Sequence, residues 1–247
     1  MSDTAESRAR AIHERKRAEI VSVVPGWYRP GPHLAIPSVL GLGVMVAAIG
    51  RIHDLRWYEL LAIPITLFAS FALEWRAHRY VLHKKTPLLG ILYRRHEHMH
   101  HVIYTYDDMQ LRSPRELWLI LMPAYAIVLV FFMVVPFAVL TALLASTNAA
   151  LLMVSTSMLF FLSYEWLHMA YHLPTNSFVG RLRFIQVLRE LHRRHHDPSL
   201  MKRWNFNVTV PVFDWIKGTL WSPERAAAAA ARPVRSNPGE VGEGLTR

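Results

Sequence analysis

The longest uncharged stretch of this chain covers residues 117–164, 48 consecutive positions without Asp, Glu, Lys or Arg. A membrane-spanning helix needs about 20 predominantly apolar residues, so this stretch is long enough for two spans. Its polar cluster, Ser146-Thr147-Asn148, is the expected turn between them. The first span would begin at residue 117 and take 29 residues, and we expect tilt or a kink at Pro123 or Pro136 to absorb the excess length.

Two shorter apolar stretches precede this one, at residues 34–50 and 60–73. Trp57, Tyr58 and Trp75 flank the second of them, and such aromatic side chains concentrate at membrane–water interfaces. The sequence therefore predicts an all-α integral membrane protein. Its four transmembrane helices would form two hairpins, over residues 34–75 and 117–168.

The basic residues are unevenly distributed around these spans. With a cytoplasmic N-terminus, residues 1–33, 76–115 and 173–247 lie inside and hold 26 of the 28 Lys and Arg residues. Positive charge favours the cytoplasmic side, so we expect this orientation. The net charge of +10 then reflects topology, and without a recognition motif we expect no nucleic-acid partner. Arginine outnumbers lysine 23 to 5, which favours a GC-rich bacterial genome and a bacterial inner membrane.

Three segments follow from this topology. Residues 1–33 form a cytoplasmic N-terminal segment with a charged helix over 4–20, and residues 34–222 form the membrane domain. Residues 223–247 contain an alanine run followed by Pro and Gly, which predicts a short helix and then a disordered tail. The cytoplasmic parts of the membrane domain, 76–115 and 169–222, hold most of the polar chemistry.

Eleven of the fourteen histidines form four groups, each beside a predicted span. The groups are His78 with His83; His96 with His98, His100 and His101; His168 with His172; and His192 with His195 and His196. The chain has no cysteine, which excludes thiolate sites and iron–sulfur clusters. So many imidazoles exceed the needs of one tetrahedral zinc and suit two metal ions in a cytoplasmic, helical, metal-binding cap. The isolated His13, His33 and His53 are expected at solvated or interfacial positions.

The spacing within the groups predicts which imidazoles share a face. Residues three or four apart on a helix point the same way. Shared faces are expected for His96 with His100, for His168 with His172, and for His192 with His195 and His196. His78 and His83 are five apart, about 140° around an ideal helix. Their helix must therefore distort, or the two must serve different metals.

The four histidine boxes, set after two membrane hairpins, resemble those of the fatty acid hydroxylase/sterol desaturase superfamily of membrane di-iron oxygenases. Residues 205–209, 213–215 and 218–219 are also similar to the family's ending, and the likeness spans roughly residues 57–220. The resemblance implies two iron ions (Fe2+/Fe3+), with O2 as co-substrate. It implies these ligands: His78, His83, His96, His100, His101, His168, His172, His192, His195 and His196. Because Glu97 interrupts the family's commoner second box, His96 is the preferred ligand there and His98 is the alternative.

Several other polar and aromatic residues near the boxes are candidates for supporting roles. The carboxylates able to orient ligand imidazoles are Glu74, Glu97, Glu165, Asp197 and Asp214, of which we favour Glu165 and Asp197. The aromatic side chains that either anchor the protein at the interface or shape a substrate pocket are Trp204, Phe206, Phe213 and Trp215. Arginines that suit an acidic electron donor, a lipid headgroup or simply the cytoplasmic bias are Arg94, Arg95, Arg193 and Arg194.

The expected function is O2-dependent hydroxylation of a membrane lipid, a fatty acyl chain or a sterol-like molecule, that reaches the site from the bilayer. The chain shows no haem or flavin module, so an external electron-transfer protein is the expected partner. Desaturation begins with the same hydrogen abstraction and is the main alternative. A metal transporter is less favoured, because the spans lack the ionisable residues that mark ion paths. A zinc-dependent lipid hydrolase needs only three protein ligands, far fewer than this chain offers.

Overall fold

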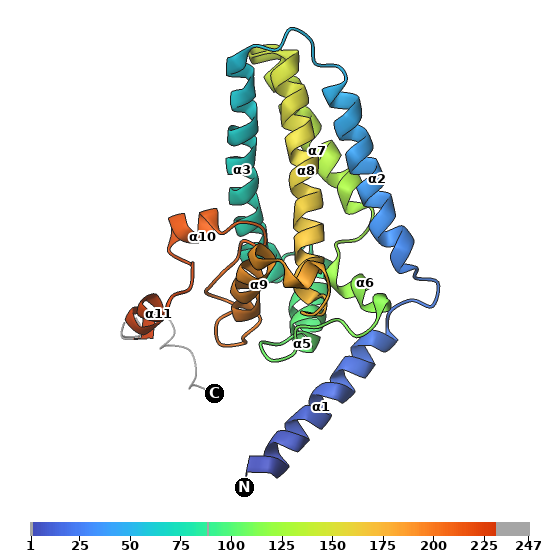
Figure 1. Ribbon diagram of the computed structural model, residues 1–247, viewed down its shortest axis with the longest axis vertical. Coiled ribbons are helices and arrows are strands. Elements are labelled where there is room, and N and C mark those ends of the chain that lie inside the picture. Colours follow the sequence, from blue (N-terminus) through green and yellow to red (C-terminus); the bar gives the residue numbers. More distant parts are fainter. Residues whose placement is uncertain (1, 88, 231–247) are drawn as a thin grey trace, which may run out of the picture.

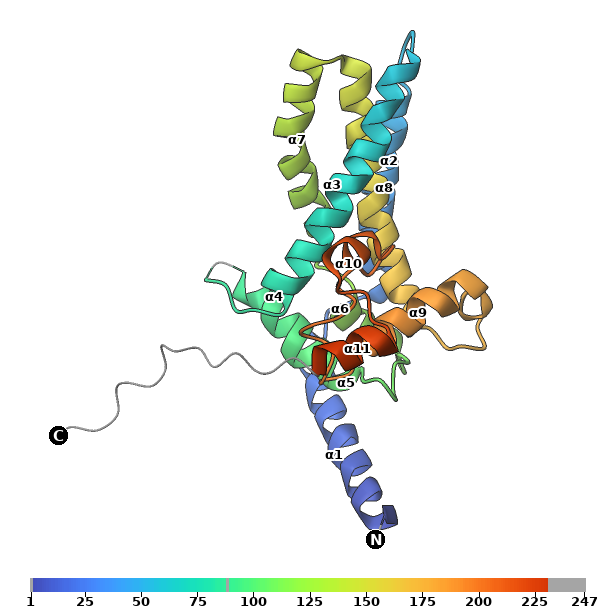
Figure 2. The ribbon, with the colours of Figure 1, turned by 90° about the vertical axis from the view of Figure 1, so that its left-hand side faces the viewer.

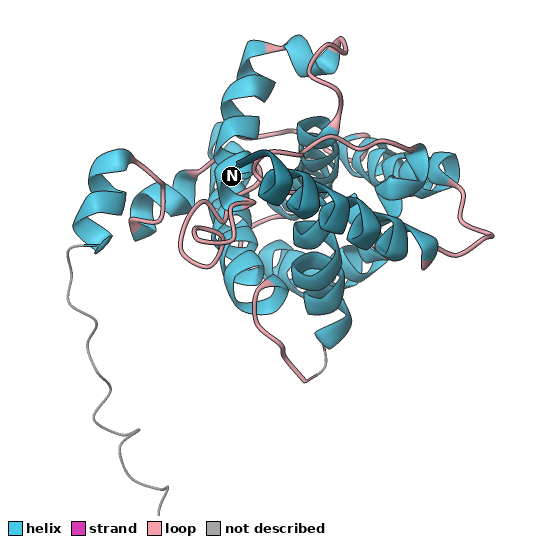
Figure 3. Cartoon of the chain, turned by 90° about the horizontal axis from the view of Figure 1, so that it is seen from below, coloured by secondary structure: helices cyan, strands magenta, loops and turns pink. Residues whose placement is uncertain are grey.

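The computed structural model describes residues 2–87 and 89–230, which form helices and loops with no strand in that part of the chain (Figure 3). Four helices are long and apolar enough to cross a membrane: α2 Pro30–Ile49, the continuous run Trp57–Leu82, α7 Ala126–Leu144 and α8 Thr147–His172. The second consists of a short 3-10 helix, α3 Ala62–Ala77 and a π-helix His78–Leu82. The four-span prediction is confirmed. In Figure 1 these four helices occupy the upper half and the short helices gather below them.

Helix α8 is the centre of the membrane bundle, because α2, α3 and α7 all pack against it (Figures 1 and 2). Small and polar residues are buried along it, including Ala150, Ser155 and Thr156. Such residues let transmembrane helices approach closely. Gly41 of α2 marks one close approach, since a Cβ there would lie 2.9 Å from the Leu162 side chain. The two hairpins are therefore joined through α8.

The expected 29-residue span starting at residue 117 is wrong at its beginning. Residues Leu117–Ile120 form the short helix α6, the chain then breaks around Pro123, and the spanning helix α7 starts only at Ala126. Proline lacks the N–H that a helix needs and disfavours helix in the residue before it. The apolar residues of α6 pack inside the cap with Tyr104. They are apolar because protein covers them, not lipid. Ser146 caps α8 by accepting a hydrogen bond from the Ala149 N–H, as expected for the turn.

The cap consists of short helices and loops below the bundle. Its elements are α4 Gly90–Arg95, a π-helix His96–His100, α5 His101–Ile103, the 3-10 helix Pro114–Glu116, α6, the 3-10 helix Val179–Arg181, α9 Arg183–His195, α10 Val212–Lys217 and α11 Pro223–Ala230. Helix α11 accounts for the alanine run, and the rest of the predicted tail lies outside the described residues. The predicted charged N-terminal helix is confirmed as α1 Ser2–Ser22, which packs on α5 and extends away from the cap (Figure 1).

Candidate metal centre

The ten histidines expected as ligands are all buried, at the end of the bundle where α3 and α8 enter the cap. Nine of them form two groups in which the nitrogen atoms lie within 4.8 Å of one another. The first group is His78, His83, His96, His101 and His195, and the second is His100, His168, His172 and His192. His196 completes the second, because its Nε2 lies 3.1 Å from Nε2 of His100 and 3.0 Å from that of His192.

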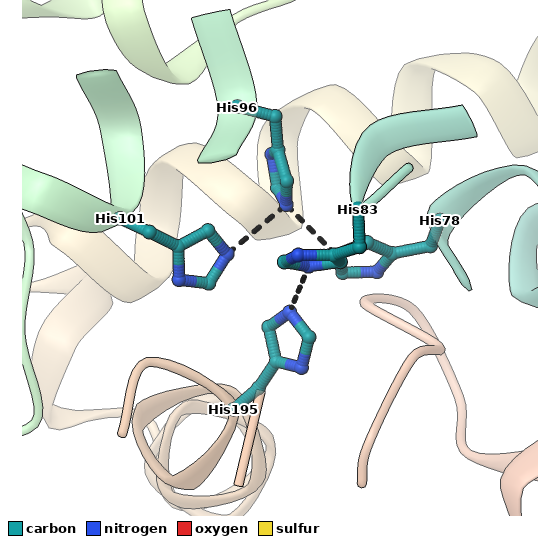
Figure 4. A group of neighbouring side chains, drawn as sticks. All are labelled: His78, His83, His96, His101 and His195. Carbon is teal, nitrogen blue, oxygen red and sulfur yellow. Dashed lines mark hydrogen bonds between the residues drawn. The ribbon is translucent and has the colours of Figure 1, made fainter. Parts of the chain in front are cut away.

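The first group draws its imidazoles from three separate parts of the chain (Figure 4). His78 and His83 come from the end of the second span, His96 and His101 from the first cap segment, and His195 from α9. In Figure 4 all five rings point toward a common centre. The Nε2 atoms of His83 and His195 are 2.9 Å apart, as are those of His78 and His96. Only the folded chain brings these residues together.

Two π-helical turns set this grouping. The N–H of His83 bonds to the carbonyl of His78, and the N–H of His101 bonds to that of His96, each five residues back. The wider π turn brings residues five apart onto one side, and such turns are frequent at functional sites. Of the two alternatives for His78 and His83, the helix distorts. The expected His96–His100 pair instead divides between the two groups, and so does the expected face of His192 with His195 and His196.

Backbone carbonyls fix the orientation of four of these rings through Nδ1. The carbonyl of Phe206 lies 2.5 Å from Nδ1 of His78, and that of Trp204 lies 2.9 Å from Nδ1 of His195. The remaining pairs are His172 with the Met109 carbonyl, at 2.8 Å, and His196 with the Tyr104 carbonyl, at 2.6 Å. A carbonyl can only accept, so each Nδ1 carries the proton. In a neutral ring Nε2 then presents a lone pair.

These lone pairs face one another, which is the observation that tests the fit of a metal. Nδ1 of His83 lies against the Glu97 carboxylate, so the neutral ring holds its proton there and turns a bare Nε2 toward the bare Nε2 of His195. Two lone pairs at 2.9 Å repel unless a cation lies between them. Donors at right angles on a metal with bonds of about 2.1 Å are about 3 Å apart. The donor set therefore fits imidazole-bound metal ions.

Burial keeps six of the cap histidines neutral. Burial, reinforced by neighbouring imidazoles, lowers the pKa of His96, His100, His101, His192, His195 and His196. A neutral imidazole binds a metal, whereas the protonated ring does not, so metal binding needs no proton release from these residues at neutral pH. The same burial excludes water, which strengthens the interaction of these donors with a cation.

The segment after the last histidine box positions the carbonyls that orient the first group. Asp214 accepts hydrogen bonds from the N–H groups of Phe206 and Asn207, at 2.9 and 2.7 Å. Glu74 accepts from the side chain of Asn207 and from the N–H of Val208, at 2.8 and 2.6 Å. Residues 206–208 are therefore held by two carboxylates. Both carboxylates were candidates from the sequence, but they act on the loop and not on an imidazole.

The two favoured carboxylates, Glu165 and Asp197, do not contact the histidines, so that prediction is corrected. Glu165 accepts from the N–H of Met122, at 3.1 Å, and Asp197 closes its own turn by accepting from Ser199. Glu97 takes the expected role at His83 and also pairs with Lys202 at 3.0 Å. Burial alone would raise the pKa of Glu97, but these two hydrogen bonds lower it. Sequence spacing favoured Glu165, whereas its side chain points toward the break before α7.

The backbone carbonyls that orient the rings were not predicted from the sequence. A carbonyl is present at every position, so no residue pattern distinguishes the four that do this. The sequence predicts the aromatic side chains of this segment either as interface anchors or as walls of a pocket. Trp204 and Phe206 are buried, and Phe206 packs edge-on against His78 and His195, whereas Trp215 is 67% exposed. The first two are thus part of the site's wall, and Trp215 is free to anchor at the interface.

The isolated histidines behave differently from one another. His53 is exposed at the far end of the bundle, as expected. His33 is buried, contrary to the expectation, and bonds to the Tyr28 hydroxyl at 2.7 Å and the Met122 carbonyl at 2.8 Å. It ties α2 to the chain break before α7. His13 lies 3.9 Å from Asp108, beside Glu14 on α1, and apart from the centre.

The second box offers a direct test of the site, because His96 is buried in the first group whereas His98 is exposed against Tyr93. His96→Ala is expected to lower activity by at least about 100-fold, since loss of a ligand exceeds the loss known for its supporting contacts. His98→Ala is expected to stay within about twofold of the unsubstituted protein. Turnover and metal content of both purified variants check this. The reverse order would assign the box to His98.

Comparison with known proteins agrees with this geometry. The sequence model of the fatty acid hydroxylase family matches residues 63–219, well over half of the chain. Among solved structures, that of full-length Scs7p, in which only the hydroxylase domain is visible, matches with a TM-score of 0.52. The two share 19% sequence identity over 78% of this chain and 67% of that one, so the likeness concerns the fold. A search of curated proteins gives no significant match.

Proposed function

This chain belongs to the fatty acid hydroxylase family, and we propose that it is a di-iron, O2-dependent membrane hydroxylase acting on a lipid. The single observation that carries the proposal is the pair of buried histidine groups whose lone pairs converge. The ten histidines named above would hold the two irons. Imidazole suits iron, and the absence of carboxylates from both groups leaves a bound metal cationic. When bound, two ferrous ions supply the electrons and open positions with which O2 is activated toward a C–H bond.

The chain's own residues position and protect this chemistry. Carbonyls of Trp204 and Phe206 hold His195 and His78, and Glu97 holds His83, so the donor atoms are oriented before any metal binds. The apolar side chains of Ile103 and Phe206 are fully buried and exclude water from the surroundings. A lipid supplies the unactivated C–H bond and reaches the cap from the bilayer that the four spans occupy.

Hydroxylation also requires reducing equivalents from outside the chain. One atom of O2 enters the C–H bond and the other leaves as water, which consumes two electrons and two protons. We propose that a separate electron-transfer protein supplies these electrons. The basic residues of α9, Arg193 and Arg194, lie two and one positions from the ligand His195. Both pair with the single carboxylate of Glu190, which leaves one positive charge in excess that suits an acidic partner.

The decisive experiment is product analysis under 18O2. Membranes containing the protein, an electron donor and a lipid extract should yield a lipid heavier by one oxygen atom, and the label should come from O2. Loss of two hydrogens without added oxygen would identify a desaturase instead. A product formed equally well without O2 would contradict the oxygenase and favour a zinc-dependent hydrolase. Metal uptake across vesicles without any lipid product would favour the transporter.

We further propose that the cap lies in the cytoplasm and that the membrane is the bacterial inner membrane. The distribution of basic residues supports this orientation, because 23 of the 25 Lys and Arg residues in the described part of the chain lie on the cap side. The chain has no cysteine, so single cysteines report the topology cleanly. In the loop between α2 and α3, a cysteine is better placed at Leu55 than at Asp54. Asp54 has a φ of 46°, a left-handed backbone conformation that Asp adopts more readily than Cys.

In this topology test, cysteines at Leu55 and Asn176 are expected to label from opposite sides of the membrane. Leu55 lies in the exposed loop between α2 and α3, and Asn176 is exposed in the cap after α8. Membrane-impermeant maleimide applied to intact spheroplasts should modify only Leu55→Cys, and permeabilised cells should expose Asn176→Cys. Labelling of both from one side would contradict the four-span topology. Labelling of only Asn176→Cys from outside would reverse the orientation.

A further inference from the structure

An apolar chamber lies at the membrane end of the cap, beside the metal centre. It has a volume of about 750 Å³, and its walls include Trp27, Ile36, Ile91, Trp118 and Tyr125. Helix α2 begins at Pro30 and helix α7 at Ala126, so these walls stand where two spans leave the bilayer. Cavities of this size and apolar character are typical of small-molecule sites. The position gives a molecule in the bilayer direct access.

A second, much smaller cavity, here called the neck, has a volume of about 20 Å³ and is lined by His96 of the first group and His168 of the second. It shares Arg95 and Pro123 with the chamber, so these two residues stand at the junction. A space of this size holds about one water molecule. A substrate chain must therefore displace side chains at the neck to reach both groups.

Arg95 lies at the neck, where its guanidinium makes three contacts. Its guanidinium lies over the Trp118 ring, 4.3 Å from the centroid, and donates to the carbonyls of Trp118 and Leu121. Pro123 on the other side belongs to the backbone break and has little freedom. Arg29 and Arg94 are exposed chamber residues, and no carboxylate lines the chamber. An apolar interior with only positive charges along its lining is complementary to an acyl chain with an anionic head.

We propose that the chamber binds a long-chain acyl lipid with an anionic head, with the chain directed past Arg95 toward His96 and His168. This inference rests on the proposed function, because it names the substrate class of the metal centre. Arg29 and Arg94 recognise the head, and the apolar walls receive the chain. A neutral, rigid sterol matches neither the charge nor the narrow neck.

The test compares two tryptophan substitutions on helix α2. Ile36→Trp fills the chamber, whereas Val39→Trp lies one turn further along α2, is 68% exposed and does not line the chamber. Equilibrium binding of palmitate to the purified metal-loaded protein should weaken about tenfold or more in Ile36→Trp, because the added ring overfills the site. Val39→Trp should bind as the unsubstituted protein does. Metal content and thermal unfolding should be unchanged in both.

Two matched ligands test the chemical class. Hexadecanol has the same chain without the charge, and it should bind about tenfold more weakly than palmitate, since charge-assisted hydrogen bonds are the stronger ones. Arg29→Gln/Arg94→Gln should remove that difference, and cholesterol should not compete. Should Ile36→Trp fail to fold, Ala124→Phe tests the opposite wall.

Unchanged palmitate affinity in the chamber-filling variants would overturn the chamber. Equal binding of the two ligands, or competition by cholesterol, would overturn the anionic acyl class. These outcomes concern binding and not turnover, so they are distinct from a failure of the proposed function.

A second, independent observation concerns the N-terminal helix, which precedes the segment matched by the family. Arg17 of α1 is an arginine with only 4% of its side chain exposed. It donates to the carbonyls of Ile103, at 3.3 Å, and Gln110, at 2.8 Å, and to the carboxylates of Asp108, at 3.2 Å, and Glu116, at 2.5 Å. One guanidinium therefore fastens the segment 103–116 at four points.

That segment supports the second histidine group. The carbonyls of Tyr104 and Met109 orient His196 and His172, and the Tyr104 ring packs 4.4 Å from the His172 ring. The Tyr104 hydroxyl donates to Glu116, the same carboxylate that Arg17 holds. Buried charge pairs of this kind are costly to break, because one charge is left without a partner. Helix α1 is thus connected to the second group through one side chain.

We infer that Arg17 is a positioning residue for the second metal position. Arg17→Gln is expected to lower metal content from two ions to about one per chain. It should also abolish the magnetic coupling between two ferric ions, measured by Mössbauer spectroscopy. Arg17→Lys keeps the charge but not the fork of donors, and it should retain part of the second metal. Glu19→Gln is the control on the same helix, since Glu19 is exposed and its side chain makes no ion pair with the segment 103–116.

Two results would overturn this assignment of Arg17. One is full metal content with unchanged coupling in Arg17→Gln. The other is an equal loss of both metals in Arg17→Lys with unchanged helical content and melting temperature. The oriented carbonyls of the segment bond to His196 and His172 of the second group, so a change in the segment should spare the first metal. A loss in Glu19→Gln equal to that in Arg17→Gln would assign the effect to the helix as a whole.

Discussion

His195→Ala is expected to abolish activity and to lower metal content while the protein still inserts and folds in detergent. His195 is fully buried, its Nδ1 is held by the Trp204 carbonyl, and its Nε2 is directed into the first group. Removing a contact that supports a ligand already costs 10- to 100-fold in comparable metal sites, so loss of the ligand should exceed about 100-fold. Insertion depends on the apolar spans, which the substitution leaves intact.

His172→Ala tests the second group in the same way. Its Nδ1 bonds to the Met109 carbonyl, and its Nε2 has no hydrogen-bond partner although it is buried. We expect a similar loss of activity and loss of the second metal. His53→Ala, at the far end of the bundle, serves as the matched control and should leave both unchanged. Metal analysis, turnover and circular dichroism measure these effects. Full activity in either ligand variant would remove that histidine from the proposed centre.

Replacement of iron by zinc is expected to preserve the fold and stop turnover completely. Zinc accepts imidazole nitrogen at about 2.0–2.1 Å, so it should occupy both histidine groups and maintain their geometry. It has no redox chemistry, however, and cannot pass electrons to O2. Thermal unfolding of the zinc and iron forms should therefore coincide within a few degrees, and both should unfold earlier after metal removal by a chelator, since binding stabilises the folded state.

This metal exchange also distinguishes the competing functions. A zinc-only protein that still forms product would contradict the oxygenase and support a hydrolase. Restored turnover on adding ferrous iron to the metal-free protein would show that zinc blocked the chemistry and had not damaged the chain. A metal-free protein as stable as the loaded one would contradict binding at the buried groups, because ten clustered imidazoles lose mutual repulsion when a cation joins them.

The spans were predictable because their signal is local. An uncharged run and the turn at Ser146 each depend on a short piece of sequence, and the four spans and the turn were confirmed. The histidine groups were visible for the same reason, since each lies within a few residues of chain. Four spans then place the ends near His78 and His168 on one side of the membrane, which predicts a common site.

The errors arose where a residue's surroundings come from distant parts of the chain. The apolar α6 segment around Leu119 looks like part of a span, but protein covers it, and hydropathy does not distinguish protein from lipid. Glu165 is well spaced from His168 along α8, yet it bonds to the Met122 N–H. Glu97 was one carboxylate among several, and only the fold brings it against His83.

By itself the sequence determined that this chain spans a membrane four times and carries enough imidazole at one end for two metal ions, because hydrophobicity and residue type are properties of each position. Only the tertiary structure decided how the imidazoles divide, since the π-helical turns at His78 and His96 place residues five apart together. It also decided the orientation of each ring. That orientation comes from the carbonyls of Tyr104, Met109 and Trp204, groups that every residue possesses and that gain a role only through their position.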